Sequence, residues 1–195
     1  SGNWHRLTDK MIERSLHALQ TLRADGLDLP HVAVNFGQDD LASEDLVDRI
    51  QWQLDTYELK PQDFVVEILE SVVAMGKDDQ IKLNIDALAK LGCPIHLDDF
   101  GTGHASIASL REFHLDTLKV DRSFVKNVDD DPGQFQMLKT IVLMAKELKL
   151  SVLAEGAESR DEIQTLTEMG CDAVQGYGIA KPMQMFEFQH WVKTH

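Results

Sequence analysis

Short apolar segments alternate with longer amphipathic segments along the chain, and this alternation restricts the fold more than any other feature. The apolar segments are residues 32–36, 64–69, 94–98, 117–121, 151–154 and 173–177. Strands that are apolar throughout are typical of a sheet that is buried on both faces. Strands and helices in alternation predict an α/β protein with a parallel sheet and helices outside it.

Capping residues predict where several of the helices begin and end. Ser43 can cap a helix that runs to about residue 57. Ser159 and Glu162 have the spacing of a capping box, and Gly170 ends the helix that follows. The remaining helices are predicted from apolar residues at helical spacing, over residues 7–22, 80–91, 105–112, 135–148 and 186–192.

The number of predicted strands leaves two architectures open. Six strands fall short of the eight of a closed barrel, and the chain opens on a helix. The fold is therefore either a barrel whose first two strands are absent or an open doubly wound sheet. The sequence has no Gly-rich dinucleotide fingerprint and no phosphate-binding P-loop. Its length suits a single domain over residues 1–195.

Charge and cysteine content exclude several classes of partner. The net charge of −14 argues against binding to DNA, RNA or an anionic membrane surface. No apolar run reaches the length of a membrane span, so we expect no direct membrane insertion. Cys93 and Cys171 each lie beside a glycine and form no metal-type pair. A disulfide stays open, but buried free thiols are favoured, which indicates a reducing compartment such as the cytoplasm.

Polar side chains gather where the predicted strands end, at the rim that carries the active site in a parallel barrel. The set is Asn35, Glu67, Glu70, Asp98, Asp99, Lys119, Asp121, Glu155, Glu158 and Gln175. Taken singly, Asp99 or Glu158 can equally cap the next helix, and Lys119 can form a rim salt bridge. Glu67 and Asp98 are harder to explain in this way, because each lies at the end of an apolar strand.

Several carboxylates at one rim repel one another in a low dielectric. Either some of them stay protonated or a divalent cation holds them together. All-oxygen ligands favour Mg²⁺, Mn²⁺ or Ca²⁺ over zinc. Adjacent Asp98 and Asp99 can serve two nearby ions, an arrangement suited to phosphodiester hydrolysis. Lys119 can then steady the attacking water or a phosphate oxygen, and Glu155 can act as general base.

Several segments resemble the signature motifs of one family, in the family's own order. They are Asp-Asp-Phe-Gly-Thr-Gly at 98–103, Lys-Val-Asp at 119–121, Ala-Glu-Gly-Ala-Glu at 154–158, Gln-Gly-Tyr at 175–177, Glu-Ile-Leu-Glu at 67–70, and Asn35 in a Val-x-Asn strand. The chain is therefore similar to EAL-type domains, which are cyclic di-GMP phosphodiesterases. This resemblance implies a TIM-like barrel and the hydrolysis of cyclic di-GMP to linear pGpG.

The resemblance also implies roles for individual residues, with two Mg²⁺ or Mn²⁺ ions as cofactors. Asn35, Glu67 and Asp98 match ligands of one metal, and Asp99 matches the second metal site. Lys119 matches the water-binding lysine, Glu155 the general base and Gln175 a supporting residue. Glu70 matches the glutamate that anchors the Gly-rich loop and couples the site to a dimer interface. We further expect Asp121 and Glu158 to contact the substrate.

Departures from the family pattern leave activity open. The family's first two strands, with Glu-Ala-Leu and a phosphate-binding arginine, would precede the first helix and are not in this sequence. The expected first metal site therefore lacks one ligand, and two sheet edges are exposed. Leu69, Gly37 and His104 replace the family's usual Thr, Ser and Tyr.

The site residues and the resemblance leave three possible functions to be tested. The first is a phosphodiesterase, as a homodimer with sensory or diguanylate-cyclase-like domains in a longer protein. The second is a catalytically impaired module that binds cyclic di-GMP as a receptor. The third is an enolase-type proton abstraction, which carboxylates and a lysine on successive strands can also serve.

Overall fold

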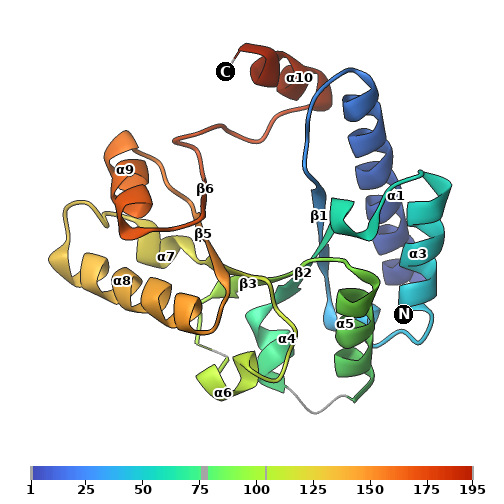
Figure 1. Cartoon of the computed structure of the whole chain (residues 1–195), viewed down its shortest axis with the longest axis horizontal. Coiled ribbons are helices and arrows are strands. Elements are labelled where there is room, and N and C mark those ends of the chain that lie inside the picture. The colour runs from blue at the N-terminus through green and yellow to red at the C-terminus, as the bar shows by residue number, and fades with distance from the viewer. Residues whose placement is uncertain (1, 76–78, 104, 195) are drawn as a thin grey trace. The chain divides into compact units, whose positions relative to one another are not determined.

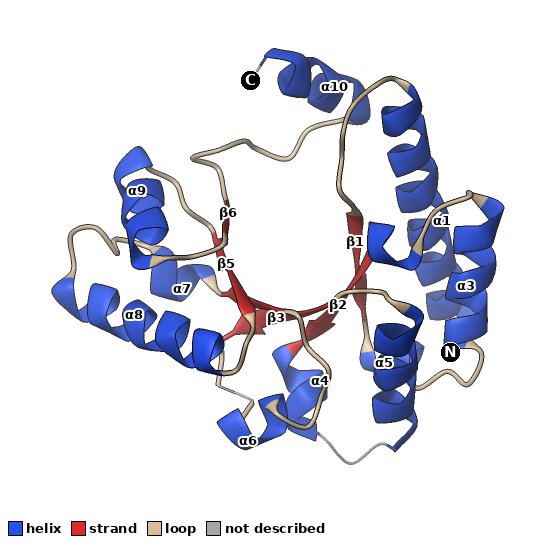
Figure 2. Cartoon of the chain, viewed as in Figure 1, coloured by secondary structure: helices blue, strands red, loops and turns tan. Residues whose placement is uncertain are grey.

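The computed structural model of the chain describes residues 2–75, 79–103 and 105–194, so His104 lies outside the described residues. The chain divides into two compact units. The first comprises residues 1–67, 76–95 and 182–195, and the second comprises residues 68–75 and 96–181. Figure 2 shows strands and helices alternating within each unit.

All six predicted strands are present. They are β1 Val32–Phe36, β2 Phe64–Leu69, β3 Ile95–Phe100, β4 Thr117–Val120, β5 Ser151–Glu155 and β6 Ala173–Gln175. They form one sheet in chain order, and the pairs from β3 to β6 are parallel. The α/β class with a parallel sheet is confirmed. The strand boundaries differ from the predicted ones by at most two residues: β3 continues to Phe100, beyond the predicted end at Asp98, and β6 ends at Gln175 rather than at Tyr177.

The longer helices lie close to their predicted positions, and several short ones were not predicted. They are α1 Gly2–Ala24, α2 Gln38–Leu41, α3 Leu46–Thr56, the 3₁₀ turn η1 Pro61–Asp63, α4 Glu70–Met75, α5 Asp79–Leu91, α6 Ile107–Leu110, α7 Arg122–Val125, α8 Pro132–Glu147, α9 Arg160–Met169 and α10 Met185–Thr194. One- or two-turn helices are too short for a periodic apolar pattern. None of the described helices combines the length and apolar character needed to cross a membrane.

The predicted cap of α3 was wrong. The residue at the cap position is Asp45 rather than Ser43, and its side chain makes no capping hydrogen bond. Ser43 Oγ donates instead to Asp45 Oδ1 at 2.6 Å, and Arg49 Nη1 binds the same oxygen at 2.9 Å. The serine is therefore part of a side-chain network on the first turn of the helix.

The core of the first unit forms because α1 is amphipathic. Ile12, Leu16 and Leu19 recur on one face of the helix and are fully buried, with α1 packed on β1 and α3. In the strands, Phe36 and Phe64 meet edge to face with their ring centroids 6.2 Å apart. Their burial supplies apolar contact area that holds β1 and β2 in place.

The strands of the second unit have two different faces. Leu118, Val120, Val152 and Ala154 are fully buried, and α7 and α8 pack against β5, as Figure 1 shows. The alternate positions belong to the other face, because successive strand residues point to opposite sides. That alternation places Lys119 of β4 and Glu155 of β5 on one face. Two charged side chains therefore project from neighbouring strands toward the same side.

The capping box predicted at α9 is confirmed. Ser159 Oγ accepts from the backbone N–H of Glu162 at 3.0 Å. The buried Glu162 carboxylate accepts from the backbone N–H groups of Glu158 at 2.7 Å, Ser159 at 3.1 Å and Asn127 at 3.0 Å. The helix ends at Gly170, which adopts the left-handed conformation with φ of 89°. Burial alone would raise the pKa of Glu162, but these N–H groups outweigh it and lower that pKa.

Replacing Glu162 with alanine is expected to lower the free energy of unfolding by about 2–3 kcal/mol at pH 7, because three part-buried backbone N–H groups lose a charged acceptor. The folded pKa lies below the ordinary 4.5. The stabilisation is therefore present above about pH 4.5 and is lost as the pH falls through the lowered folded pKa. Urea unfolding between pH 7 and pH 3 measures this, with the exposed Glu168→Ala as control. Equal losses in the two variants would contradict the assignment.

Candidate active site

Lys119 is a buried cation held between two carboxylates. Its Nζ lies 2.8 Å from Asp98 Oδ1 and 2.9 Å from Glu155 Oε1. The lysine side chain is 6% exposed, against 13% for Asp98 and 17% for Glu155. The contacts of an ion pair this deeply buried are weakly screened by solvent. The structure thus brings together three of the predicted site residues, from β3, β4 and β5.

A β-bulge explains how two adjacent aspartates come to lie at one site. Leu97 of β3 pairs with Leu118 of β4, and Phe100 pairs with Val120, so two residues of β3 stand opposite one residue of β4. Asp99 has a φ of 56°, in the left-handed region that aspartate tolerates better than most residues. A bulge of this kind redirects side chains that would otherwise alternate between faces. The bulge was not predicted, because it depends on the register of β3 against β4, and the strand was expected to end at Asp98.

The three carboxylates at this point form a group that fits a divalent cation. One oxygen each from Asp98, Asp99 and Glu155 lies within 4.8 Å of the others, and all three residues are half-buried. Burial, followed by the charges of Asp98 and Asp121, raises the pKa of Asp99 above its ordinary value. Lys119 neutralises only part of the negative charge of the group. An all-oxygen donor set with excess negative charge suits Mg²⁺ or Mn²⁺.

Glu70 holds the glycine-containing loop that follows β3. Its carboxylate accepts from the backbone N–H of Gly101 at 3.1 Å, of Thr102 at 3.0 Å and of Ala105 at 2.5 Å. The hydroxyl of Thr102 donates to the same side chain at 3.1 Å. Glu70 is 2% exposed, so its charge is balanced by these donors rather than by water. This is the contact that the resemblance implied for Glu70.

Gly101 is required by the path of that loop. Its φ is 105°, which residues with a side chain rarely adopt, and a Cβ at this position would overlap the ring of Phe124. The loop can therefore pass close to α7 only with glycine here. The missing side chain at Gly101 allows the close approach, and the hydrogen bonds from Thr102 to Glu70 hold the loop there.

The remaining predicted residues of the second unit lie beside this cluster. A pocket of about 270 Å³ is lined by Arg122, Glu155, Gly156, Glu158, Gln175, Gly176 and Tyr177. Gln175 pairs with Glu155 across β5 and β6, and its side chain is exposed. Glu158 forms an ion pair with Arg122, whose Nη2 lies 2.6 Å from Glu158 Oε1. Arg122 was not among the predicted site residues, although it follows the Lys-Val-Asp motif, and Tyr177 was named only as part of the Gln-Gly-Tyr motif.

Asp121 has a structural contact of its own. Its Oδ1 accepts from the backbone N–H of Ser123 at 2.9 Å and caps α7. The hydrogen bond from Ser123 holds the pKa of Asp121 below its ordinary value. The predicted substrate contact of Asp121 remains a prediction.

Asn35 and Glu67 belong to the first unit. Asn35 lies in β1 next to the buried Phe36, and its side chain is exposed. Glu67 lies in β2 and is 9% exposed. Both lie within strands that were predicted, and their role as metal ligands remains a prediction.

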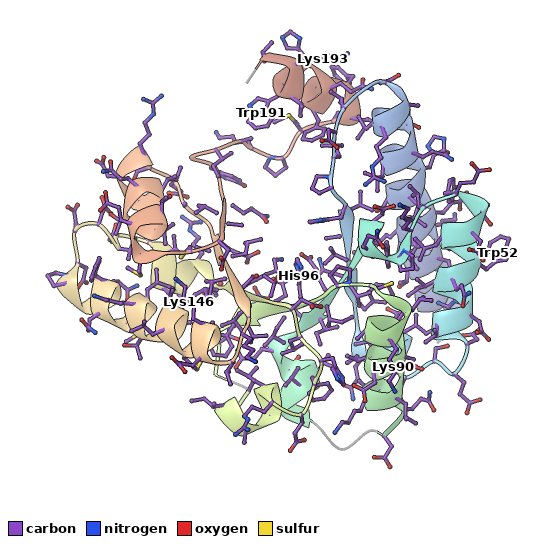
Figure 3. All side chains as sticks on the ribbon, viewed as in Figure 1. Trp52, Lys90, His96, Lys146, Trp191 and Lys193 are labelled. Carbon is purple, nitrogen blue, oxygen red and sulfur yellow. The ribbon has the colours of Figure 1, made fainter. Side chains whose placement is uncertain are left out.

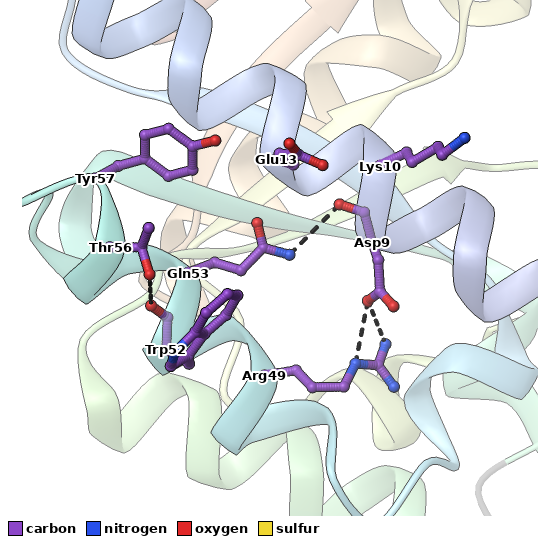
Figure 4. Close-up of a pocket in the computed structure, with 8 residues that line it drawn as sticks. All are labelled: Asp9, Lys10, Glu13, Arg49, Trp52, Gln53, Thr56 and Tyr57. Atoms are coloured by element: carbon purple, nitrogen blue, oxygen red, sulfur yellow. Dashed lines mark hydrogen bonds and ion pairs between the residues drawn. The ribbon is translucent and has the colours of Figure 1, made fainter.

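A second pocket, of about 390 Å³, lies between α1 and α3 in the first unit (Figure 4). Arg49 binds Asp9 Oδ1 of α1 through Nε at 3.1 Å, which ties the two helices together. Its Nη1 binds Asp45 Oδ1, at the start of the same helix, at 2.9 Å. Gln53 adds a bond to the backbone carbonyl of Asp9 at 3.4 Å. Trp52 projects outward from α3 and is 69% exposed (Figure 3). Because Arg49 is engaged in ion pairs, we interpret this pocket as part of the contact between the two helices rather than as a ligand site.

Comparison with known proteins places the chain among related sequences. A family model described as the EAL domain matches residues 2–182. Cyclic di-GMP phosphodiesterase NbdA of Pseudomonas aeruginosa is 32% identical over 195 residues, which cover 100% of this chain and 25% of NbdA. Cyclic di-GMP phosphodiesterase PdeR of Escherichia coli K12 is 34% identical over 174 residues, 89% of this chain and 26% of PdeR. The chain spans about a quarter of the length of these two relatives.

A solved structure shares the fold. The PaMucR phosphodiesterase in complex with c-di-GMP matches with a TM-score of 0.87 and 27% sequence identity, covering 96% of this chain and 75% of that one. This likeness supports the barrel-type architecture over the open doubly wound sheet.

Proposed function

Since the chain belongs to the EAL domain family, we propose that it hydrolyses one phosphodiester bond of cyclic di-GMP and releases linear pGpG. The observation that carries the proposal is the placement of Lys119 between Asp98 and Glu155, with Asp99 beside them. NbdA and PdeR are both cyclic di-GMP phosphodiesterases, and the matching PaMucR structure is a complex with c-di-GMP.

The acidic group is proposed to bind two Mg²⁺ or Mn²⁺ ions. Asp98 and Asp99 are the ligands supported by geometry, and Asn35 and Glu67 are proposed as further ligands from the resemblance. When bound, such ions supply a Lewis acid for the phosphate and lower the pKa of a bound water.

Glu155 is proposed to act as general base. It takes a proton from the attacking water, whose oxygen forms a bond to phosphorus while the bond from phosphorus to the ribose 3′-oxygen breaks. The leaving oxygen then takes up a proton. Lys119 holds Glu155 and Asp98 at 2.8–2.9 Å, so it fixes the direction of the base and offers positive charge to the phosphate oxygens. Gln175, paired with Glu155, is proposed to support this arrangement.

The proposal is tested by incubating the chain, and the full product of its gene, with cyclic di-GMP and either Mg²⁺ or Mn²⁺. Chromatography is expected to show pGpG as the product, and EDTA is expected to abolish it, because it removes the ions that would activate the water and the phosphate. Adding the metal back restores turnover. Tight binding in calorimetry with no pGpG from either protein, at any metal concentration, would decide for the receptor function.

Assembly and location are proposed from the same family membership. We propose a homodimer in the cytoplasm, with Glu70 and its loop near the dimer contact, and further sensory or cyclase-like domains in a longer protein. The match covers only about a quarter of NbdA and of PdeR, which supports the proposal of further domains. Size-exclusion chromatography with light scattering tests the dimer.

A further inference from the structure

Helix α2 is a single turn that follows β1 and is held in place by side chains of other elements. Gly37 is its N-cap and offers no capping side chain. A helix of one turn has little stability of its own. Asp40 and Leu41 of this turn are nevertheless buried. The position of α2 therefore depends on α1 and α5, which both contact it.

The contact from α5 is made by Asn84, which is a buried asparagine. Its Nδ2 donates to the backbone carbonyls of Leu41 and of Ser43, at 2.7 Å each. Its Oδ1 accepts from Gln80 Nε2 at 3.1 Å, which fixes the orientation of the amide. The last carbonyls of a helix have no partner within the helix. Asn84 therefore supplies donors that the end of α2 lacks.

The contact from α1 is made by Thr8. Its Oγ1 donates to Asp40 Oδ2 at 2.9 Å, and both residues are buried. A hydrogen bond to a carboxylate is stronger than one between neutral groups, and burial keeps water from replacing it. Helix α2 is therefore held on two sides, at the Asp40 side chain by α1 and at its carbonyl end by α5.

Asn35 lies two residues before Gly37, near the carboxyl end of β1. Strand β1 is the first in the order of the sheet, so within the described residues only β2 pairs with it. A strand that is paired on one side depends more on the chain that follows it for the position of its end. Metal ligation is sensitive to that position, because ligand distances stay within about 0.2 Å of their ideal values.

We propose that Asn84 and Thr8 are positioning residues of the metal site: they hold α2, and through it the end of β1, so that the Asn35 amide stays where the ion binds. Neither residue lies in the motifs that identify the site, and neither is expected to touch the ion or the substrate. This inference rests on the proposed function, because Asn35 is a metal ligand only within that proposal.

The test is calorimetry with Mn²⁺ alone, without substrate, on the proteins used for the hydrolysis experiment. Asn84→Leu and Thr8→Val remove the donors at nearly constant volume, and each is expected to raise the Kd for Mn²⁺ by about 10-fold. The Mn²⁺ concentration for half-maximal turnover rises by the same factor, while kcat at saturating Mn²⁺ keeps the wild-type value. Thr8→Ser retains the hydroxyl and restores the wild-type affinity.

Two further variants calibrate the measurement. Ile85→Val shortens the fully buried neighbour of Asn84 in α5, so it lowers stability without removing a polar contact, and it is expected to keep the wild-type Kd for Mn²⁺. Asn35→Ala removes the proposed ligand itself and gives the largest loss of affinity that the two positioning residues can produce.

The outcomes separate this inference from the proposed function. Weaker Mn²⁺ binding in Asn35→Ala, with the wild-type Kd in Asn84→Leu and Thr8→Val, overturns the positioning role and leaves the metal site intact. An equal rise of Kd in Ile85→Val also overturns it, because the effect is then a general loss of stability. If Asn84→Leu does not fold, equal affinity in Thr8→Val and Thr8→Ser overturns it. An unchanged Kd in Asn35→Ala removes Asn35 from the ligands and the inference with it, while pGpG formation decides hydrolysis independently.

Discussion

Replacing Lys119 with methionine is expected to lower the hydrolysis of cyclic di-GMP by about 100- to 10,000-fold. The variant removes the cation that lies 2.8 Å from Asp98 and 2.9 Å from Glu155, and so releases the proposed base from its fixed direction. Methionine has a similar length and adds no steric conflict. Single-turnover kinetics at saturating substrate measure the loss in the chemical step.

The same variant has a readout that does not depend on activity. Without the lysine, the carboxylates of Asp98, Asp99 and Glu155 repel one another, and the free energy of unfolding is expected to fall by about 3 kcal/mol without metal. Mg²⁺ is then expected to raise the melting temperature more in Lys119→Met than in the wild type. Lys126→Met, an exposed lysine at the end of α7, is the control. A Lys119→Met protein with wild-type turnover would remove the lysine from the mechanism.

Replacing Glu70 with alanine is expected to lower the free energy of unfolding by about 3 kcal/mol and to free the loop after β3. The carboxylate accepts four hydrogen bonds from Gly101, Thr102 and Ala105. Glu70 itself is only 2% exposed, so water cannot easily replace these donors. Hydrogen exchange is the direct measurement, because these backbone N–H groups lose their acceptor and exchange faster.

Two further variants sharpen the Glu70 experiment. Glu70→Gln keeps one acceptor oxygen at nearly the same volume and is expected to show about half of the effect on stability. Glu112→Ala changes an exposed glutamate near α6 and is expected to stay within about 0.5 kcal/mol of wild type. Fast exchange at Gly101 in the wild type, or no change in Glu70→Ala, would show that the loop is held by something else.

The strands and the longer helices could be predicted because they depend on residues close together in the sequence. Strand β1 at Val32–Phe36 and strand β2 at Phe64–Leu69 have the predicted boundaries, since each is a largely apolar run that a glycine or a charged residue follows. Gly170 ended its helix as expected. Helix α2 and helix α7 were missed because a single turn leaves no repeat in the sequence.

The site could be predicted as a set of residues but not as an arrangement. Strand ends and motif order pointed to Lys119 and Glu155, while the contact of both with each other depends on the register of β4 and β5. The ion pair of Arg122 with Glu158 joins residues 36 positions apart. Charge at two distant positions carries no information on pairing until the topology brings them together.

Because of the bulge at Asp98 and Asp99, the number of residues in β3 determines which face of the sheet each side chain points to. Substituting Asp98 removes an oxygen donor but keeps the backbone path. Deleting a single residue within this six-residue strand would instead reverse the facing of the side chains on one side of the deletion. An insertion or deletion in β3 would therefore disturb the site even where both aspartates are retained.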